Sequence, residues 1–174
     1  MLNYFCGIKI INIKFNMIMN TTILGLDKNK TEELTAELNV LLANFQVYYQ
    51  SLRGLHWNIK GKNFFELHVK FEELYTDTQE KVDVIAERVL TLQGKPLHTF
   101  SDYVKIATVP VAKNISKDEE AVLLVVASLT ALLKIERNIL NLSDVADDEG
   151  TNSLMSDFIS EQEKTLWMMN AWLG

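Results

Sequence analysis

Apolar residues recur at intervals of three and four along most of the chain, which is the spacing of one face of an α-helix. The clearest run covers residues 64–92, with apolar side chains at Phe64, Leu67, Phe71, Leu74, Val82, Ile85, Val89 and Leu92. This run predicts one long amphipathic helix. It should stop at residues 94–96 (GKP), because Gly relaxes the backbone and Pro cannot continue the hydrogen-bond ladder.

A helix of similar length is expected before this run. Thr31, followed by two glutamates, is its expected N-cap, and its apolar side repeats as far as about Asn58. Gly61 is its expected C-cap. A hairpin at residues 61–63 would then fold the two helices against each other.

The second half of the chain predicts two more long helices. Ser116, with three acids behind it, should start the third helix, which runs to about Val145. Thr151 or Asn152 should cap the fourth. A short turn of helix is expected to start at residues 101–102, within the connection to the third helix.

Composition agrees with an all-helical domain. The chain has 174 residues, of which 48% are hydrophobic, and only 7 Gly and 2 Pro. That is enough for one domain with a sizeable core, and the scarcity of helix breakers favours long helices. The single cysteine, Cys6, cannot form an intrachain disulfide, which fits a reducing compartment.

The first 18 residues are apolar but unlike a signal peptide or a membrane span. Lys9 and Lys14 interrupt them, no small-residue cleavage pattern follows, and the run is shorter than the ~20 apolar residues that a bilayer requires. We hypothesise that translation starts at Met19. The expected organisation is therefore an N-terminal extension (1–18), a tail (19–30) and a bundle domain (31–174).

Four side chains that commonly bind metals lie on a stripe beside the apolar face of residues 64–92. His68 and Glu72 are spaced i, i+4, as are Asp83 and Glu87, so each pair can present two donor atoms to one ion. The two pairs are separated by roughly 22 Å of helix, whereas ligand atoms must approach an ion to about 2.0–2.2 Å. One chain therefore cannot close the site. Two copies packed antiparallel about a twofold axis would bring opposite ends together and create two identical sites.

His56, near the end of the preceding helix, extends this set to two imidazoles and three carboxylates. Such a mixed nitrogen and oxygen site suits iron, manganese or zinc, and we favour iron because a site shared by two chains leaves coordination positions open for an oxidant. The competing interpretation is a helical scaffold without catalysis. Histidines on amphipathic helices are usually hydrogen-bonded, and acids beside an apolar stripe usually face solvent.

The local sequence resembles the Dps family of ferritin-like proteins. The likeness is carried by residues 55–61 (LHWNIKG), 64–68 (FFELH), 71–75 (FEELY) and 83–88 (DVIAER), with the closing helix matched at 163–167 (EKTLW) and 171–174 (AWLG). In these motifs both the residue types and the intervals between them match the family pattern. One departure is Glu72, where the family often has the shorter Asp.

The resemblance implies a ferritin-like four-helix bundle with a short extra helix between the second and third helices, assembled as a dodecamer from twofold dimers. It implies a ferroxidase that oxidises ferrous iron, preferably with hydrogen peroxide, and stores the ferric mineral. The implied centre takes His56, His68 and Glu72 from one subunit and Asp83 and Glu87 from its mate. The neighbouring Trp57 would serve as a local electron donor, although packing at the hairpin is its simplest role.

An acidic cluster lies between the third and fourth predicted helices. Acids before a helix start are favoured by the helix dipole and by solvation. The resemblance implies a second use, because the family lines threefold pores for iron with acids in this region. Asp144 and Asp148 are the positions that carry over, whereas Ser153 stands where some members have another acid.

DNA compaction is the competing function from another class. The net charge of −6 and the scattered lysines argue against it, because DNA-binding members often use flexible basic tails. We expect DNA binding to be weak or absent. The resemblance implies a cytoplasmic protein, with association with the nucleoid as a second option. A classical ferritin centre inside one bundle is disfavoured, because the chain has no Glu-x-x-His motif.

Overall fold

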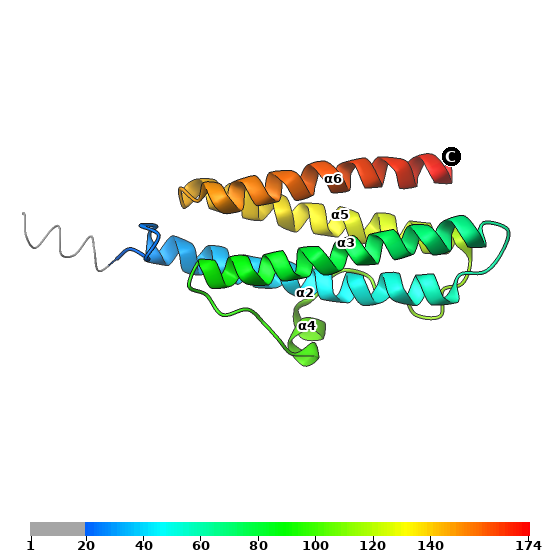
Figure 1. The fold of residues 1–174 in the computed structure, drawn as a ribbon, viewed down its shortest axis with the longest axis horizontal. Coiled ribbons are helices and arrows are strands. Elements are labelled where there is room, and N and C mark those ends of the chain that lie inside the picture. Colours follow the sequence, from blue (N-terminus) through cyan, green and yellow to red (C-terminus); the bar gives the residue numbers. More distant parts are fainter. Residues whose placement is uncertain (1–19) are drawn as a thin grey trace, which may run out of the picture.

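The computed structural model describes residues 20–174, which contain four long helices and one short helix (Figure 1). The long helices are α2 (Lys28–Asn58), α3 (Phe64–Thr91), α5 (Asp118–Val145) and α6 (Glu149–Leu173), and the short one is α4 (Phe100–Ile106). The predicted all-α class and the extra helix between the second and third long helices are confirmed. The predictions for residues 1–18, including Cys6, lie outside the described residues.

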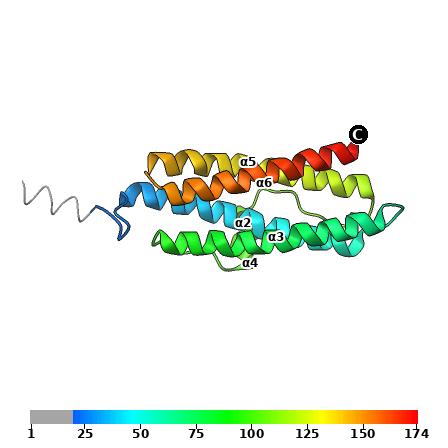
Figure 2. The ribbon, with the colours of Figure 1, turned by 45° about the horizontal axis from the view of Figure 1, so that its top comes forward.

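The long helices form two antiparallel hairpins, α2 with α3 and α5 with α6, which pack side by side (Figures 1 and 2). The connection between the hairpins runs from one end of the bundle to the other, so α3 and α5 point in the same direction. The short helix α4 lies in this connection and packs against α2. One long crossover is the connectivity of ferritin-like bundles.

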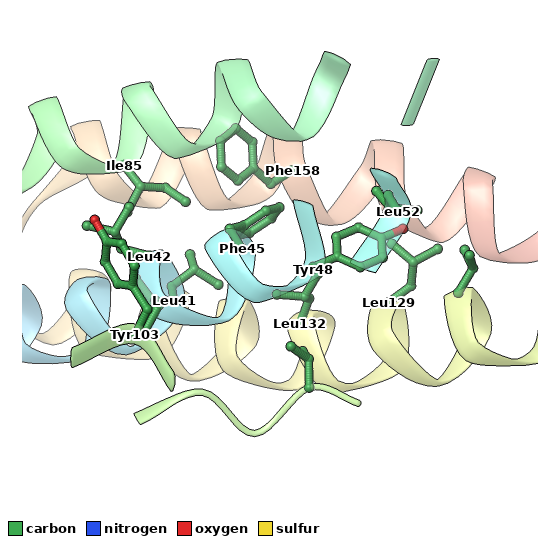
Figure 3. Packing of buried hydrophobic residues seen from close by; sticks show 14 of the residues in the cluster. Leu41, Leu42, Phe45, Tyr48, Leu52, Ile85, Tyr103, Leu129, Leu132 and Phe158 are labelled. Carbon is green, nitrogen blue, oxygen red and sulfur yellow. The ribbon is translucent and has the colours of Figure 1, made fainter. Parts of the chain in front are cut away.

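The core lies between the four long helices, and Figure 3 shows part of it. At its centre the rings of Phe45 on α2 and Phe158 on α6 meet edge to face with their centroids 6.1 Å apart. Burying a side chain of this size stabilises the fold by roughly 1.5–3 kcal/mol. The apolar side predicted for the first helix is buried throughout: Leu34, Leu38, Leu41, Leu42, Phe45, Tyr48 and Leu52. None of the helices in residues 20–174 is both long and apolar enough to cross a membrane.

Two helices begin earlier than predicted. The side chain of Asp27 accepts hydrogen bonds from the amides of residues 29 and 30, at 2.9 and 3.1 Å, so α2 starts at Lys28. Thr31, the predicted cap, donates its hydroxyl to the Asp27 carbonyl instead. In the same way Asp148, rather than Thr151 or Asn152, caps α6. In both cases an Asp upstream of the Thr provides an equally good cap.

The third long helix begins later than predicted. It starts at Asp118, and the preceding Lys117 makes no side-chain cap. The first turn instead carries Asp118, Glu119 and Glu120, whose charges favour the N-terminal end of the helix dipole. Ser116 takes part differently, since its carbonyl accepts the amide of Lys60 at 2.9 Å and ties the start of α5 to the α2–α3 turn.

The two glycines predicted at helix ends have other roles. The α2 helix ends at Asn58 with Ile59 as its cap, and Gly61 lies in the following turn with φ +119°, where a side chain would be strained. After α3 the positive φ falls on Gln93, not Gly94. A Cβ on Gly94 would lie 2.9 Å from Thr35 Cγ2, so glycine is needed there for close packing on α2.

Candidate metal centre

His56 and His68 are brought together by the turn between α2 and α3. Their imidazole rings stack with centroids 3.7 Å apart and planes inclined by 21°. Nδ1 of His56 lies 2.8 Å from the carbonyl oxygen of His68, and Nδ1 of His68 lies 2.8 Å from the carbonyl oxygen of His56. The short α2–α3 turn therefore brings the two histidines level with each other.

These reciprocal hydrogen bonds require a proton on Nδ1 of each ring. A carbonyl oxygen can only accept, so each Nδ1 must carry the proton. In the neutral imidazoles both Nε2 atoms then present a lone pair. Metal-bound histidines are typically held in this way, with one nitrogen donating to a backbone carbonyl while the other binds the ion. The structure thus supplies two oriented nitrogen donors.

Glu72 follows His68 by one helical turn and is oriented by Tyr75. The Tyr75 hydroxyl donates to Glu72 Oε1 at 3.0 Å, and the Tyr75 ring meets the His56 ring edge to face at 5.4 Å. Tyr75 therefore contacts one candidate ligand on each helix, Glu72 on α3 and His56 on α2. Sequence reasoning missed it, although its position three residues after Glu72 and seven after His68 places it on the same face of α3.

Asp83 and Glu87 lie farther along α3 and are exposed. Within residues 20–174, no three side chains of His, Cys, Asp or Glu lie close enough together to hold one ion. One subunit therefore brings His56 and His68 together and leaves Asp83 and Glu87 at a different point of α3.

Trp57 does not pack at the hairpin as its simplest interpretation suggested. Its side chain is 58% exposed, and the Arg53 guanidinium lies 4.7 Å from the ring centroid. A cation above an indole face is favourable even at an exposed site. The indole is therefore held in place by a neighbour on α2 while remaining accessible.

An apolar groove between α2 and α4 opens beside this region. It has a volume of about 260 Å³ and is lined on the α2 side by residues between Gln46 and Gly54. Gly54 lies two positions before His56. Phe100, Val104 and Val111 at its rim are largely exposed. Contiguous exposed apolar surface of this kind is typical of protein–protein contacts.

The acidic cluster between α5 and α6 divides into exposed and buried members. Asp144 is exposed, but Asp148 is only 3% exposed and is fully engaged within the subunit. It forms an ion pair with Arg88 of α3 and accepts the Thr151 hydroxyl at 2.6 Å. The expectation that Asp148 lines a pore is therefore corrected, because its carboxylate holds the start of α6 against α3.

Known proteins share this fold and much of this sequence. Residues 35–174 match the ferritin family, described as a ferritin-like domain. The DNA protection during starvation protein of Porphyromonas gingivalis is 40% identical over 150 residues, covering 86% of this chain and 94% of the relative. A Dps crystal structure from Vibrio cholerae superposes with a TM-score of 0.87 at 49% identity, covering 89% of this chain and 98% of that one. A Bacillus brevis Dps structure gives 0.82 at 35% identity, with coverage of 84% and 98%.

The bundle and these matches define a ferritin-like protein. Within that class, the chain belongs to the Dps family.

Proposed function

We propose that this protein is a ferroxidase and iron-storage mini-ferritin whose catalytic centres lie at a twofold interface between subunits. His56, His68 and Glu72 of one subunit bind ferrous iron together with Asp83 and Glu87 of the partner subunit. The observation that carries the proposal is the reciprocal pair of Nδ1 hydrogen bonds, which leaves the Nε2 lone pair of each ring available to an ion. Within residues 20–174 of one subunit, these nitrogens and Glu72 do not form a complete metal site, so the proposal draws the remaining ligands from the partner subunit.

The interface follows from the distance between the two halves of the ligand set. Asp83 lies 15 residues after His68 on one continuous helix, which separates them by roughly 22 Å. Two α3 helices packed antiparallel would pair the His68 end of each with the Asp83 end of the other. The exposed apolar rim at Phe100, Val104 and Val111 supplies surface that such a contact would bury.

The ligand set suits oxidation of ferrous iron. Carboxylate oxygens are hard donors that favour ferric over ferrous iron, and the two imidazoles position the first ion. Two ferrous ions supply the two electrons that reduce one hydrogen peroxide, with two protons, to two waters. Because the peroxide is consumed in a two-electron step, no hydroxyl radical is released. In this proposal Trp57, which is adjacent to His56 and exposed in the single subunit, donates an electron when only one iron is oxidised.

Relatives supply the wider setting for this chemistry. The Porphyromonas gingivalis relative is named for DNA protection during starvation, and the Vibrio cholerae structure is described as a member of the ferritin-like diiron-carboxylate proteins. We extend these roles to this chain as storage of ferric mineral in a dodecameric shell and protection of DNA by removal of iron and peroxide. Asp144, which is exposed, remains the candidate acid at an iron entry pore.

Ferrous oxidation followed optically tests the proposal. The assembled protein is mixed anaerobically with ferrous iron and then given hydrogen peroxide or oxygen, alongside a His56→Ala/His68→Ala variant of unchanged oligomeric state. We expect faster oxidation with peroxide than with oxygen, and a loss of at least about a hundredfold in the variant, since even residues that only support metal ligands are worth 10- to 100-fold. A matched control is His98→Ala, which changes an exposed histidine in the α3–α4 connection. Equal rates in all three proteins would mean that the histidine pair is structural.

A further inference from the structure

A second group of polar side chains lies inside the bundle. Glu136 on α5 and Gln162 on α6 are 0% and 4% exposed. The Gln162 amide nitrogen donates to Glu136 Oε1. The remaining oxygens of the same two side chains, Glu136 Oε2 and Gln162 Oε1, are buried and have no hydrogen-bond partner. Buried polar atoms without partners are rare in folded proteins, so this pair requires an explanation.

One proton satisfies both oxygens. A carboxylate and an amide oxygen are both acceptors and cannot bond to each other. A proton on Glu136 Oε2 turns that oxygen into a donor, and its proposed acceptor is Gln162 Oε1, an unpartnered oxygen on the side chain that already bonds to Glu136. The acid and the amide then form a ring of two reciprocal hydrogen bonds. In one, the Gln162 N–H donates to Glu136 Oε1; in the other, the Glu136 O–H donates to Gln162 Oε1.

We propose that Glu136 is a buried proton-binding site, which in the folded subunit holds a proton on Oε2 and donates it to Gln162 Oε1, and that loss of this proton weakens the packing of α5 on α6. The site is independent of the candidate metal centre, because none of the five ligand residues contributes to it.

The surrounding charges do not replace the proton. On α3 the Lys81 ammonium, itself only 5% exposed, is already bound by Asp77 on its own helix and by Glu161 of α6. On α5 Arg137 reaches the surface and pairs with Glu163 of α6 at 2.6 Å. Both cations are thus neutralised by other acids.

The helix α2 contributes one titratable group to this part of the core. The hydroxyl of Tyr48 is buried beside Asp77 and has no hydrogen-bond partner, and Figure 3 shows the Tyr48 ring within the core cluster. Burial raises the pKa of this phenol above its ordinary value, with Asp77 adding to the effect, so it stays neutral. No cation from α2 therefore offsets a charge on Glu136.

The electrostatics of Glu136 agree with this geometry. Burial raises the pKa of Glu136 to about 7, and the opposing effects of the Gln162 hydrogen bond, Lys81 and Arg137 are smaller. Because the folded-state pKa lies above the ordinary 4.5, the folded subunit binds more protons than the unfolded chain between these values. The stability that the acid form contributes is therefore complete below pH 4.5 and is lost as pH rises through about 7.

Infrared spectroscopy of the assembled protein tests the proposal. Between pH 6 and 8 the fraction of Glu136 in the acid form should fall roughly tenfold. We expect wild-type protein to show a protonated carboxyl band at pH 6 that disappears by pH 8.5, and the band to be absent from Glu136→Gln. The matched control Asp157→Asn, which removes an exposed carboxylate of α6 that does not pair with Lys81 or Arg137, should keep it. A missing band in wild type, or its persistence in Glu136→Gln, would overturn the proposal.

Thermal unfolding measured over the same pH range tests the effect on packing. The unfolding temperature of wild type and of Asp157→Asn should fall from pH 6 to 8.5, whereas Glu136→Gln, which can form an amide–amide pair at any pH, should change less. An equal fall in Glu136→Gln would contradict the coupling. If Glu136→Gln does not fold, Gln162→Met decides the matter, because losing the amide should move the acid band of Glu136 to higher frequency. A band that stays in place would mean that the reciprocal pair is absent.

Discussion

The buried polar side chains of the bundle and the ligand residues on α2 and α3 differ in where their partners come from. Arg88 and Asp148 pair inside one chain, and so do Lys81 and Glu161. Among residues 20–174, only one ring nitrogen each of His56 and His68 finds a hydrogen-bond partner, and Asp83 and Glu87 are exposed. The fold itself satisfies the two interior pairs, because leaving their charges unpaired would cost stability. Groups kept open at the surface are available for an ion and a second subunit.

The largest effect on stability should follow from Asp148→Ala. This change leaves the Arg88 guanidinium without its acid, removes the acceptor for Thr151 and deletes the cap of α6. We expect a loss of about 3 kcal/mol in the free energy of unfolding, as for other broken buried ion pairs. Urea unfolding at a fixed subunit concentration measures it. Ferrous oxidation per folded subunit should stay at the wild-type rate. Such a result would show that Asp148 contributes to stability and not to the candidate metal centre.

Asp144→Ala is the matched control, because it removes an exposed acid only four residues away. Its free energy of unfolding should change by less than about 0.5 kcal/mol. If the two variants were equally destabilised, the buried ion pair would contribute no more to the free energy of unfolding than an exposed acid does.

A smaller effect, confined to oxidation, should follow from Tyr75→Phe. The ring is kept against His56, but the hydrogen bond that orients Glu72 is lost. Loss of a group that orients a metal ligand typically costs at least tenfold, so we expect ferrous oxidation to slow by about tenfold, with an unchanged unfolding temperature. Tyr49→Phe removes a hydroxyl that contacts Gln79 instead and should oxidise iron at the wild-type rate. Equal rates in Tyr75→Phe and wild type would show that Glu72 needs no support.

The helices could be predicted from the sequence because their apolar residues repeat over many turns. Their ends could not be placed as well, since Asp27 and Thr31, like Asp148 and Thr151, are both competent caps and only the folded backbone selects between them. The same ambiguity affected the pore acids. Asp144 and Asp148 look alike in sequence, and only the position of Arg88 shows that one of them is engaged inside the subunit.

The candidate ligand residues could be proposed from the sequence for a different reason. Their i, i+4 spacing on one helix can be counted, and so can the length of helix that separates the two pairs. Neither the stacking of His56 on His68 nor the crossed hydrogen bonds could be foreseen, because the acceptors are backbone carbonyls whose positions depend on the turn. The role of Tyr75 likewise depends on a contact across two helices.

The most direct test of a shared centre combines two inactive subunits in one assembly. His56→Ala/His68→Ala subunits lack one half of the ligand set, and Asp83→Asn/Glu87→Gln subunits lack the other. Each alone should be inactive. In a twofold dimer of one of each, both defects fall in one centre and the other centre is intact. Random co-assembly of equal amounts should therefore restore about one quarter of the wild-type oxidation rate. No recovery in mixed assemblies of normal size would contradict a centre built from two chains.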